Sequence, residues 1–157
     1  MMNRLLLACA LLAAGAAQAD DRRYTATDPL WQAECASCHL PYPPQLLGAD
    51  AWRRMMAGLD RHFGSDASLD ATTAAAVERF LVAHAATKRS ITDTPPTGEA
   101  PRITATPWFR KEHREVPDAL WRSPRVGSAA RCDACHRRAG DGDYSERTLQ
   151  LPRAAIR

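Results

Sequence analysis

The chain has little that would build a sheet or a large hydrophobic core. Only 6% of its 157 residues are aromatic, and no stretch alternates apolar and polar residues with the period of two that marks a half-buried strand. Beyond the first twenty residues, no apolar run is long enough to cross a bilayer. These absences favour a small helical protein whose own core is modest.

Cysteine is scarce too. Of the five cysteines, Cys9 lies in the leading apolar segment, and the other four form two pairs that are each followed by histidine. If both pairs have a role of their own, no cysteine remains for a stabilising disulfide. The two copies are Cys35-Ala36-Ser37-Cys38-His39 and Cys132-Asp133-Ala134-Cys135-His136.

The first nineteen residues have the pattern of an export signal. A positive start at Met1 to Arg4 precedes an apolar run from Leu5 to Ala14 that is too short to span a bilayer, and Ala17-Gln18-Ala19 is a small-residue cleavage site. We expect cleavage after Ala19, location in the periplasm and a mature chain that does not span the membrane. Cys9 is discarded with the signal in this interpretation, and a lipoprotein anchor at Cys9 is the minor alternative.

The two C-x-x-C-H motifs predict two covalently bound haem c groups. In each motif the two thiols can add to the two vinyl groups at one haem edge, and the adjacent histidine can bind the iron. A structural zinc site would require pairs that lie far apart in the sequence to converge, and a thioredoxin-like redox pair would require strands. The duplication favours haem. It assigns Cys35, Cys38, Cys132 and Cys135 to haem attachment and His39 and His136 to the irons.

Helix signals recur along the chain, and they predict an all-α fold. Caps or first-turn prolines open helices at Asp28-Pro29, at Asp50, at Asp70 or Thr72, and at Thr106-Pro107. The expected helices from Asp50 and from Asp70 run to Gly64 and to about Lys88, one turn is expected over 118–121, and Ser128 caps a helix that carries the second motif.

The distribution of these signals divides the chain. We expect two small haem-binding lobes, each with a C-x-x-C-H helix, joined by long irregular connections. Residues 1–19 are the signal, 20–89 the first lobe, 90–106 a linker rich in proline and threonine, and 107–157 the second lobe.

The second axial ligand of each iron decides between an electron carrier and an enzyme. His62 lies on the strongest apolar helical face, and His113 lies on a short helix ahead of the second motif, so we expect these two as distal ligands. His84 also lies on an apolar stripe and is the rival, whereas Met55 and Met56 are more simply core residues. Proximity in the sequence assigns His62 to the first haem and His113 to the second.

Four stretches carry a more specific pattern: 34–44, 52–64, 102–109, and Glu112-His113 with the second motif. Together they resemble the small bacterial dihaem cytochromes c, or DHC family. The resemblance covers nearly the whole mature chain and implies a periplasmic electron carrier with two bis-histidine, low-spin haems, ligated distally by His62 and His113. It also implies two partners, a membrane b-type cytochrome and an oxygen-binding monohaem cytochrome c. Another polar residue usually occupies the position of His84 in that family, so an alternative ligand set stays open.

Two functions follow from these patterns. Electron relay between redox proteins is the leading hypothesis, and a haem enzyme or gas-binding sensor with an open or displaceable axial site is the alternative. The formal charge of +3 gives no support for nucleic-acid binding, because loss of Arg4 leaves +2 and four ionised propionates would bring the charge to about −2.

Overall fold

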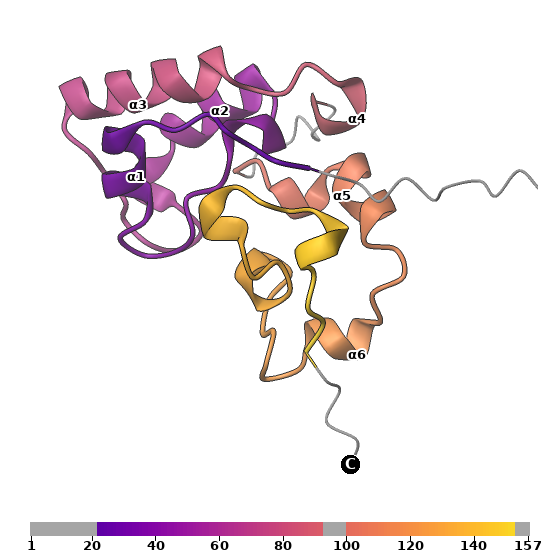
Figure 1. Cartoon of the computed structure of the whole chain (residues 1–157). Helices are drawn as coiled ribbons and strands as arrows, with labels where there is room; N and C mark the ends of the chain where they lie inside the picture. The colour runs from indigo at the N-terminus through magenta and orange to yellow at the C-terminus, as the bar shows by residue number, and fades with distance from the viewer. Residues whose placement is uncertain (1–21, 93–99, 153–157) are drawn as a thin grey trace, which may run out of the picture.

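The computed structural model describes residues 22–92 and 100–152, and this part of the chain is mostly helical (Figure 1). The predicted export signal and the middle of the predicted linker lie outside the described residues. Extended pairing within these ranges is limited to isolated bridges. The helices are α1 (Pro29–Cys35), α2 (Ala49–Met56), α3 (Ala71–Ala83), α4 (Arg89–Thr92), α5 (Pro107–Glu112) and α6 (Asp118–Trp121), joined by short 3-10 turns.

The all-α fold is therefore confirmed. Of the helices in the described ranges, none combines the length and the apolar character that a membrane crossing needs. The described parts of the stretch predicted as a linker contain all of α4 except its first residue, Arg89, and the 3-10 turn η3 (Ile103–Ala105). The division of the chain into two lobes remains a prediction.

Side-chain caps begin three of the helices where the sequence predicts them. The Asp28 carboxylate accepts a hydrogen bond from the Trp31 backbone N–H at 2.8 Å and opens α1. Asp70 accepts from Thr72 and Thr73 and opens α3, and the Thr106 hydroxyl accepts from the Phe109 N–H at 3.1 Å and opens α5. Each cap satisfies backbone donors that the first helical turn leaves free.

The helix predicted from Asp50 to Gly64 is wrong at both ends. Gly48 holds the N-cap position of α2, and Asp50 lies in the first turn, where it pairs with Arg53 at 2.6 Å. The helix ends at Met56, and the 3-10 turn η2 (Leu59–Arg61) follows. Phe63 and Gly64 then have φ angles of 50° and 93°, which no right-handed helix accommodates.

The third predicted helix is shorter than expected. It ends at Ala83, with His84 at its C-cap, rather than near Lys88. The Ala86 N–H donates to the Leu47 carbonyl at 2.8 Å, so the chain turns toward the segment before α2 instead of continuing the helix.

The prediction of a helix at the second C-x-x-C-H motif is also wrong. The motif begins on the 3-10 turn η4 (Cys132–Ala134), whereas the first motif begins at the last residue of α1. The Ser128 hydroxyl accepts from the Ala130 N–H, two residues on, and the Ala134 N–H donates to the Arg131 carbonyl. These tight turns consume the local donors that an α-helix would use.

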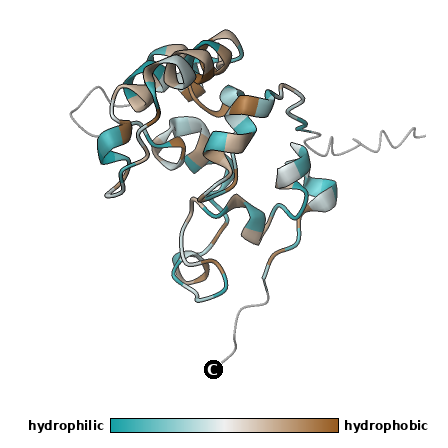
Figure 2. Cartoon of the chain, turned by 90° about the vertical axis from the view of Figure 1, so that its left-hand side faces the viewer, coloured by the Kyte–Doolittle hydropathy of each residue, from teal (hydrophilic) through white to brown (hydrophobic). Residues whose placement is uncertain are grey.

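Two hydrophobic clusters hold the described residues together. The larger lies between α1, α2 and α3, and in Figure 2 hydrophobic residues gather between the helices of this part. The smaller cluster joins α4 and α5. Its Trp108 and Phe109 lie beside the second motif described below. The buried members are Trp31, Leu47, Ala51, Trp52, Met55, Val77 and Leu81 in the larger cluster, and Leu46, Ile91, Trp108 and Phe109 in the smaller.

The two ends of the described chain pair with each other. The Tyr24 N–H donates to the Gly142 carbonyl at 2.8 Å, and the Tyr144 N–H donates to the Arg22 carbonyl at 2.9 Å. The rings of Tyr24 and Tyr144 also meet edge to face at 5.3 Å. Residues 22–24 are thus anchored beside the second motif, although the sequence assigns them to the first lobe.

Candidate haem sites

The first motif brings its histidine opposite His62. Cys35 is the last residue of α1, and Cys38 and His39 occupy the exposed turn that follows. The His39 Nδ1 atom hydrogen-bonds the Leu40 carbonyl at 2.7 Å. His62 follows the turn η2, and its ring centre lies 6.1 Å from that of His39 with 23° between the ring planes.

The second motif repeats this arrangement with other elements. His113 is the C-cap residue of α5, and its Nδ1 atom hydrogen-bonds the Phe109 carbonyl at 2.9 Å. Its ring centre lies 6.2 Å from that of His136, with 77° between the planes. His113, His136, Cys132 and Cys135 all line one cavity.

Both separations fit two imidazoles on opposite sides of one iron. A metal–imidazole bond is about 2 Å long and the bonding nitrogen lies about 1 Å from the ring centre, so the ring centres of two axial ligands lie roughly 6 Å apart. Backbone bonds at Nδ1 of His39 and His113 leave the other ring nitrogen as the one that could bind a metal. The buried Nδ1 atoms of His62 and His136 have no hydrogen-bond partner in the described chain.

His84 lies apart from both pairs. It is exposed at the end of α3, its Nδ1 atom hydrogen-bonds the Phe80 carbonyl at 2.9 Å, and its ring lies 4.8 Å from the Phe80 ring. Met55 is buried in the larger hydrophobic cluster, and Met56 packs against the same cluster. The structure therefore brings His62 and His113 to the motif histidines and places the rival donors elsewhere.

The cavity at the second motif has the lining that a large apolar cofactor needs. It encloses about 160 Å³, and most of the side chains that line it are apolar. Trp108 and Tyr144 also line it, and their buried Nε1 and hydroxyl groups have no partner in the described chain. Such orphaned polar groups can donate to a bound carboxylate such as a haem propionate. The apolar lining includes Leu46, Ile103, Phe109, Val116, Trp121 and Leu149.

Burial sets the protonation of the site residues. It lowers the pKa of His62, His113 and His136, and at His62 and His136 the neighbouring histidine lowers the pKa further. Neutral imidazole is the form that binds a metal, so these shifts favour ligation.

Burial also favours the neutral form of three motif cysteines. Burial raises the pKa of Cys35 and of Cys132 to about 11 and also raises the pKa of Cys135.

Within residues 22–92 and 100–152, no three histidine, cysteine, aspartate or glutamate side chains gather as a metal-ion site. The four motif cysteines therefore do not form the zinc site considered as an alternative.

Tyr42 is a site residue that the sequence did not single out. Its ring stacks on His39 at 4.8 Å between ring centres, and its hydroxyl donates to the Ala130 carbonyl at 2.7 Å. The only signal in the sequence is an aromatic residue in the proline-rich stretch after the first motif. Its contact with the second motif depends on tertiary structure alone.

Comparisons with known proteins match this chain to one family in sequence and in fold. The profile of the family described as dihaem cytochrome c matches residues 31–144. A diheme cytochrome type c from Shewanella baltica OS155 is similar in structure, with 39% identity, a TM-score of 0.68, and coverage of 80% of this chain and 93% of its own. No curated protein sequence matches at a significant level.

A diheme cytochrome c from Rhodobacter sphaeroides is also similar, with 38% identity, a TM-score of 0.66, and coverage of 77% of this chain and 99% of its own. These identities extend over most of both chains, so the likeness is one of sequence as well as fold. This chain carries two covalently bound haem c groups and belongs to the dihaem cytochrome c family.

Proposed function

We propose that this protein relays electrons between redox partners in the periplasm through two low-spin haems, each bound by two histidines, and that it catalyses no reaction of its own. Membership of the dihaem cytochrome c family gives haem-based electron transfer. The observation that supports the finer proposal is the pairing of His39 with His62 and of His113 with His136 at 6.1 and 6.2 Å.

The chain's own residues would hold both axial positions of each haem iron, His39 and His62 at the first site and His113 and His136 at the second. Haem c supplies an iron that alternates between the ferrous and ferric states. The backbone carbonyls of Leu40 and Phe109 hold one imidazole of each pair in a set orientation through Nδ1. Two strong ligands that are already in position leave little room for a substrate or a gas at the iron, and this favours a carrier over an enzyme or a sensor.

The partners we propose are a membrane b-type cytochrome and an oxygen-binding monohaem cytochrome c, to which the electrons pass. Interfaces between redox proteins are small and transient, so each partner needs only a limited surface near one haem edge. Cell fractionation of a strain that makes the full chain, followed by haem staining, tests the periplasmic location.

The decisive experiment compares spectra of the dithionite-reduced protein with and without carbon monoxide. An unchanged Soret band is expected, because two histidines per iron exclude the gas. A large shift would show an open or labile axial site and would support the alternative, a haem enzyme or gas-binding sensor.

A further inference from the structure

A second hollow lies against the outer side of the second C-x-x-C-H motif. Three exposed arginines line it, Arg125, Arg131 and Arg137, and Asp133 lies among them. Arg131 directly precedes Cys132 and Arg137 directly follows His136. The motif backbone therefore fixes two of the three positive charges in relation to the haem attachment site.

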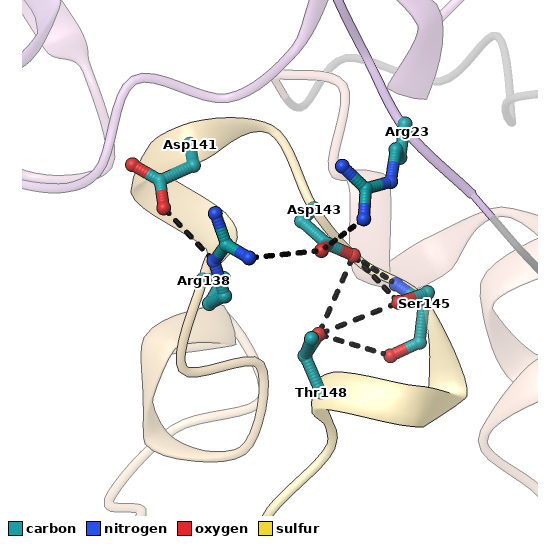
Figure 3. A network of polar contacts seen from close by, with 6 residues as sticks. All are labelled: Arg23, Arg138, Asp141, Asp143, Ser145 and Thr148. Atoms are coloured by element: carbon teal, nitrogen blue, oxygen red, sulfur yellow. Dashed lines mark hydrogen bonds and ion pairs between the residues drawn. The ribbon is translucent and has the colours of Figure 1, made fainter.

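These three arginines are not used to hold the fold. None of them forms an ion pair within residues 22–92 and 100–152, although Asp133 lies in the same hollow. The neighbouring Arg138 behaves differently, since it pairs with Asp141 at 3.1 Å and reaches Asp143 at 4.0 Å (Figure 3). Three like charges around one hollow repel one another, and an anionic group placed there removes that repulsion.

The hollow and the second haem site share a wall. Arg131 lines both the hollow and the haem cavity, and buried Ala134 of the motif lines the hollow. The charge of Arg137 also acts on Cys135, where it opposes the rise in pKa that burial causes. A partner seated in the hollow would thus lie directly beside the attached edge of the second haem.

We propose that this three-arginine hollow docks an acidic surface of a redox partner and that the haem at Cys132 and Cys135 exchanges electrons with that partner. The proposal rests on the relay function proposed above. Arginine suits the role, because its planar guanidinium binds carboxylates through two parallel hydrogen bonds. In the transfer, one electron leaves the ferrous iron, which becomes ferric, and reduces the partner's acceptor by one electron, with no bond made or broken.

The test uses the holoprotein on a gold electrode coated with a carboxylate-terminated monolayer, which imitates an acidic protein surface. Cyclic voltammetry at low ionic strength compares the wild type with the triple variant Arg125→Gln, Arg131→Gln and Arg137→Gln. We expect the electron-transfer rate of the variant to fall roughly tenfold, the lower end of the range for electrostatic steering. Substitution of the same three arginines by lysine keeps the charges and should retain most of the rate.

A matched control removes three positive charges elsewhere. Arg53→Gln, Arg54→Gln and Arg79→Gln change α2 and α3, at the other end of the molecule from the second motif in Figure 1. This control should exchange electrons with the carboxylate surface at the wild-type rate. An equal loss in both triple variants would overturn the proposal, because the effect would then belong to total charge.

Electron exchange in solution with the cation hexaammineruthenium(III) checks that both haems of the glutamine variant can still transfer electrons. Its rate should be unchanged or slightly higher in the Arg125, Arg131 and Arg137 variant. If the Arg125, Arg131 and Arg137 variant exchanges electrons with the carboxylate surface at the wild-type rate, the proposed docking site is wrong. The relay proposal would fail separately, through a carbon monoxide shift in the wild-type spectrum.

Discussion

Tyr42 connects the two haem motifs, since its ring stacks on His39 of the first while its hydroxyl donates a 2.7 Å hydrogen bond to the carbonyl of Ala130, two residues before the second. Burial, with the nearby Cys132 and Asp133 as smaller causes, raises the pKa of Tyr42 to about 12, so the hydroxyl keeps the proton it donates. One side chain thus contacts both the predicted iron ligand His39 and the segment that leads into the second motif.

Tyr42→Phe should weaken this connection without removing the ring. Loss of one hydrogen bond is expected to cost about 1 kcal/mol of holoprotein stability, because the Ala130 carbonyl can turn to water. Guanidinium unfolding followed by haem absorbance measures the change. Tyr42→Leu removes the stacked ring as well and should also shift the reduction potential of one haem. Equal stability of the wild type and Tyr42→Phe would contradict the structural role of this hydrogen bond.

The histidine pairs predict which substitutions leave a haem iron with a vacant ligand position. His62→Ala and His113→Ala should each let one of the two reduced haems bind carbon monoxide, with a Soret shift of about half the amplitude expected for two open sites. His84→Ala is the matched control and should bind none, because His84 is exposed and its ring contacts Phe80 rather than a motif histidine. Carbon monoxide binding by the His84 variant would show that the ligand set is different.

Gly142 is expected to be intolerant of any side chain. Its φ angle of 73° is left-handed, and a Cβ atom there would collide with the backbone carbonyl oxygen of Tyr24. Gly127 has almost the same φ angle, 74°, but a Cβ atom there would meet no atom within 4 Å.

The two alanine variants therefore separate backbone strain from collision. Gly127→Ala should cost about 1 kcal/mol, the strain of a left-handed alanine. Gly142→Ala should cost clearly more, since the segment 22–24 must move away from 142–144. Thermal unfolding of both holoproteins measures the difference, and similar melting temperatures would argue against the close packing of the chain ends.

Local chemistry explains which parts of the fold could be predicted. Asp28, Asp70 and Thr106 cap helices because the cap depends on a few neighbouring residues. Helix ends depended on tertiary contacts, as when Ala86 donates to Leu47 and draws the chain away from α3.

The candidate ligands show the same limit. The sequence predicts His62 as a ligand from its place on a helical face, yet α2 ends at Met56 and the 3-10 turn η2 brings His62 to His39 instead. The apolar pattern correctly predicts that His62 faces the interior, but it predicts a helical backbone where the chain forms a 3-10 turn. The contact of Tyr42 with Ala130 and the gathering of Arg125, Arg131 and Arg137 around one hollow could not be predicted, because both depend on how the folded chain is arranged.

Asp143 should make the stability of the protein depend on acid pH. Its carboxylate is buried, with 1% of the residue exposed, and one oxygen accepts hydrogen bonds from the Ser145 hydroxyl and N–H at 2.6 and 3.0 Å. The other oxygen pairs with Arg23 at 3.2 Å, so the cluster fastens the first described segment beside the second haem site (Figure 3). These contacts, those with Ser145 above all, hold the pKa of Asp143 below its usual range.

A folded-state pKa below the unfolded value of about 4 means that the unfolded chain takes up a proton first as the pH falls. The stabilisation from Asp143 is therefore complete at neutral pH and is lost as the pH drops through about 4 toward the folded-state pKa. Asp143→Asn should melt several degrees lower at pH 7 and lose less stability between pH 5 and pH 3 than the wild type. Asp141→Asn is the control, because Asp141 is exposed and its ion pair is with Arg138 at the surface. Parallel melting curves for Asp143→Asn and the wild type across this range would show that another carboxylate governs acid unfolding.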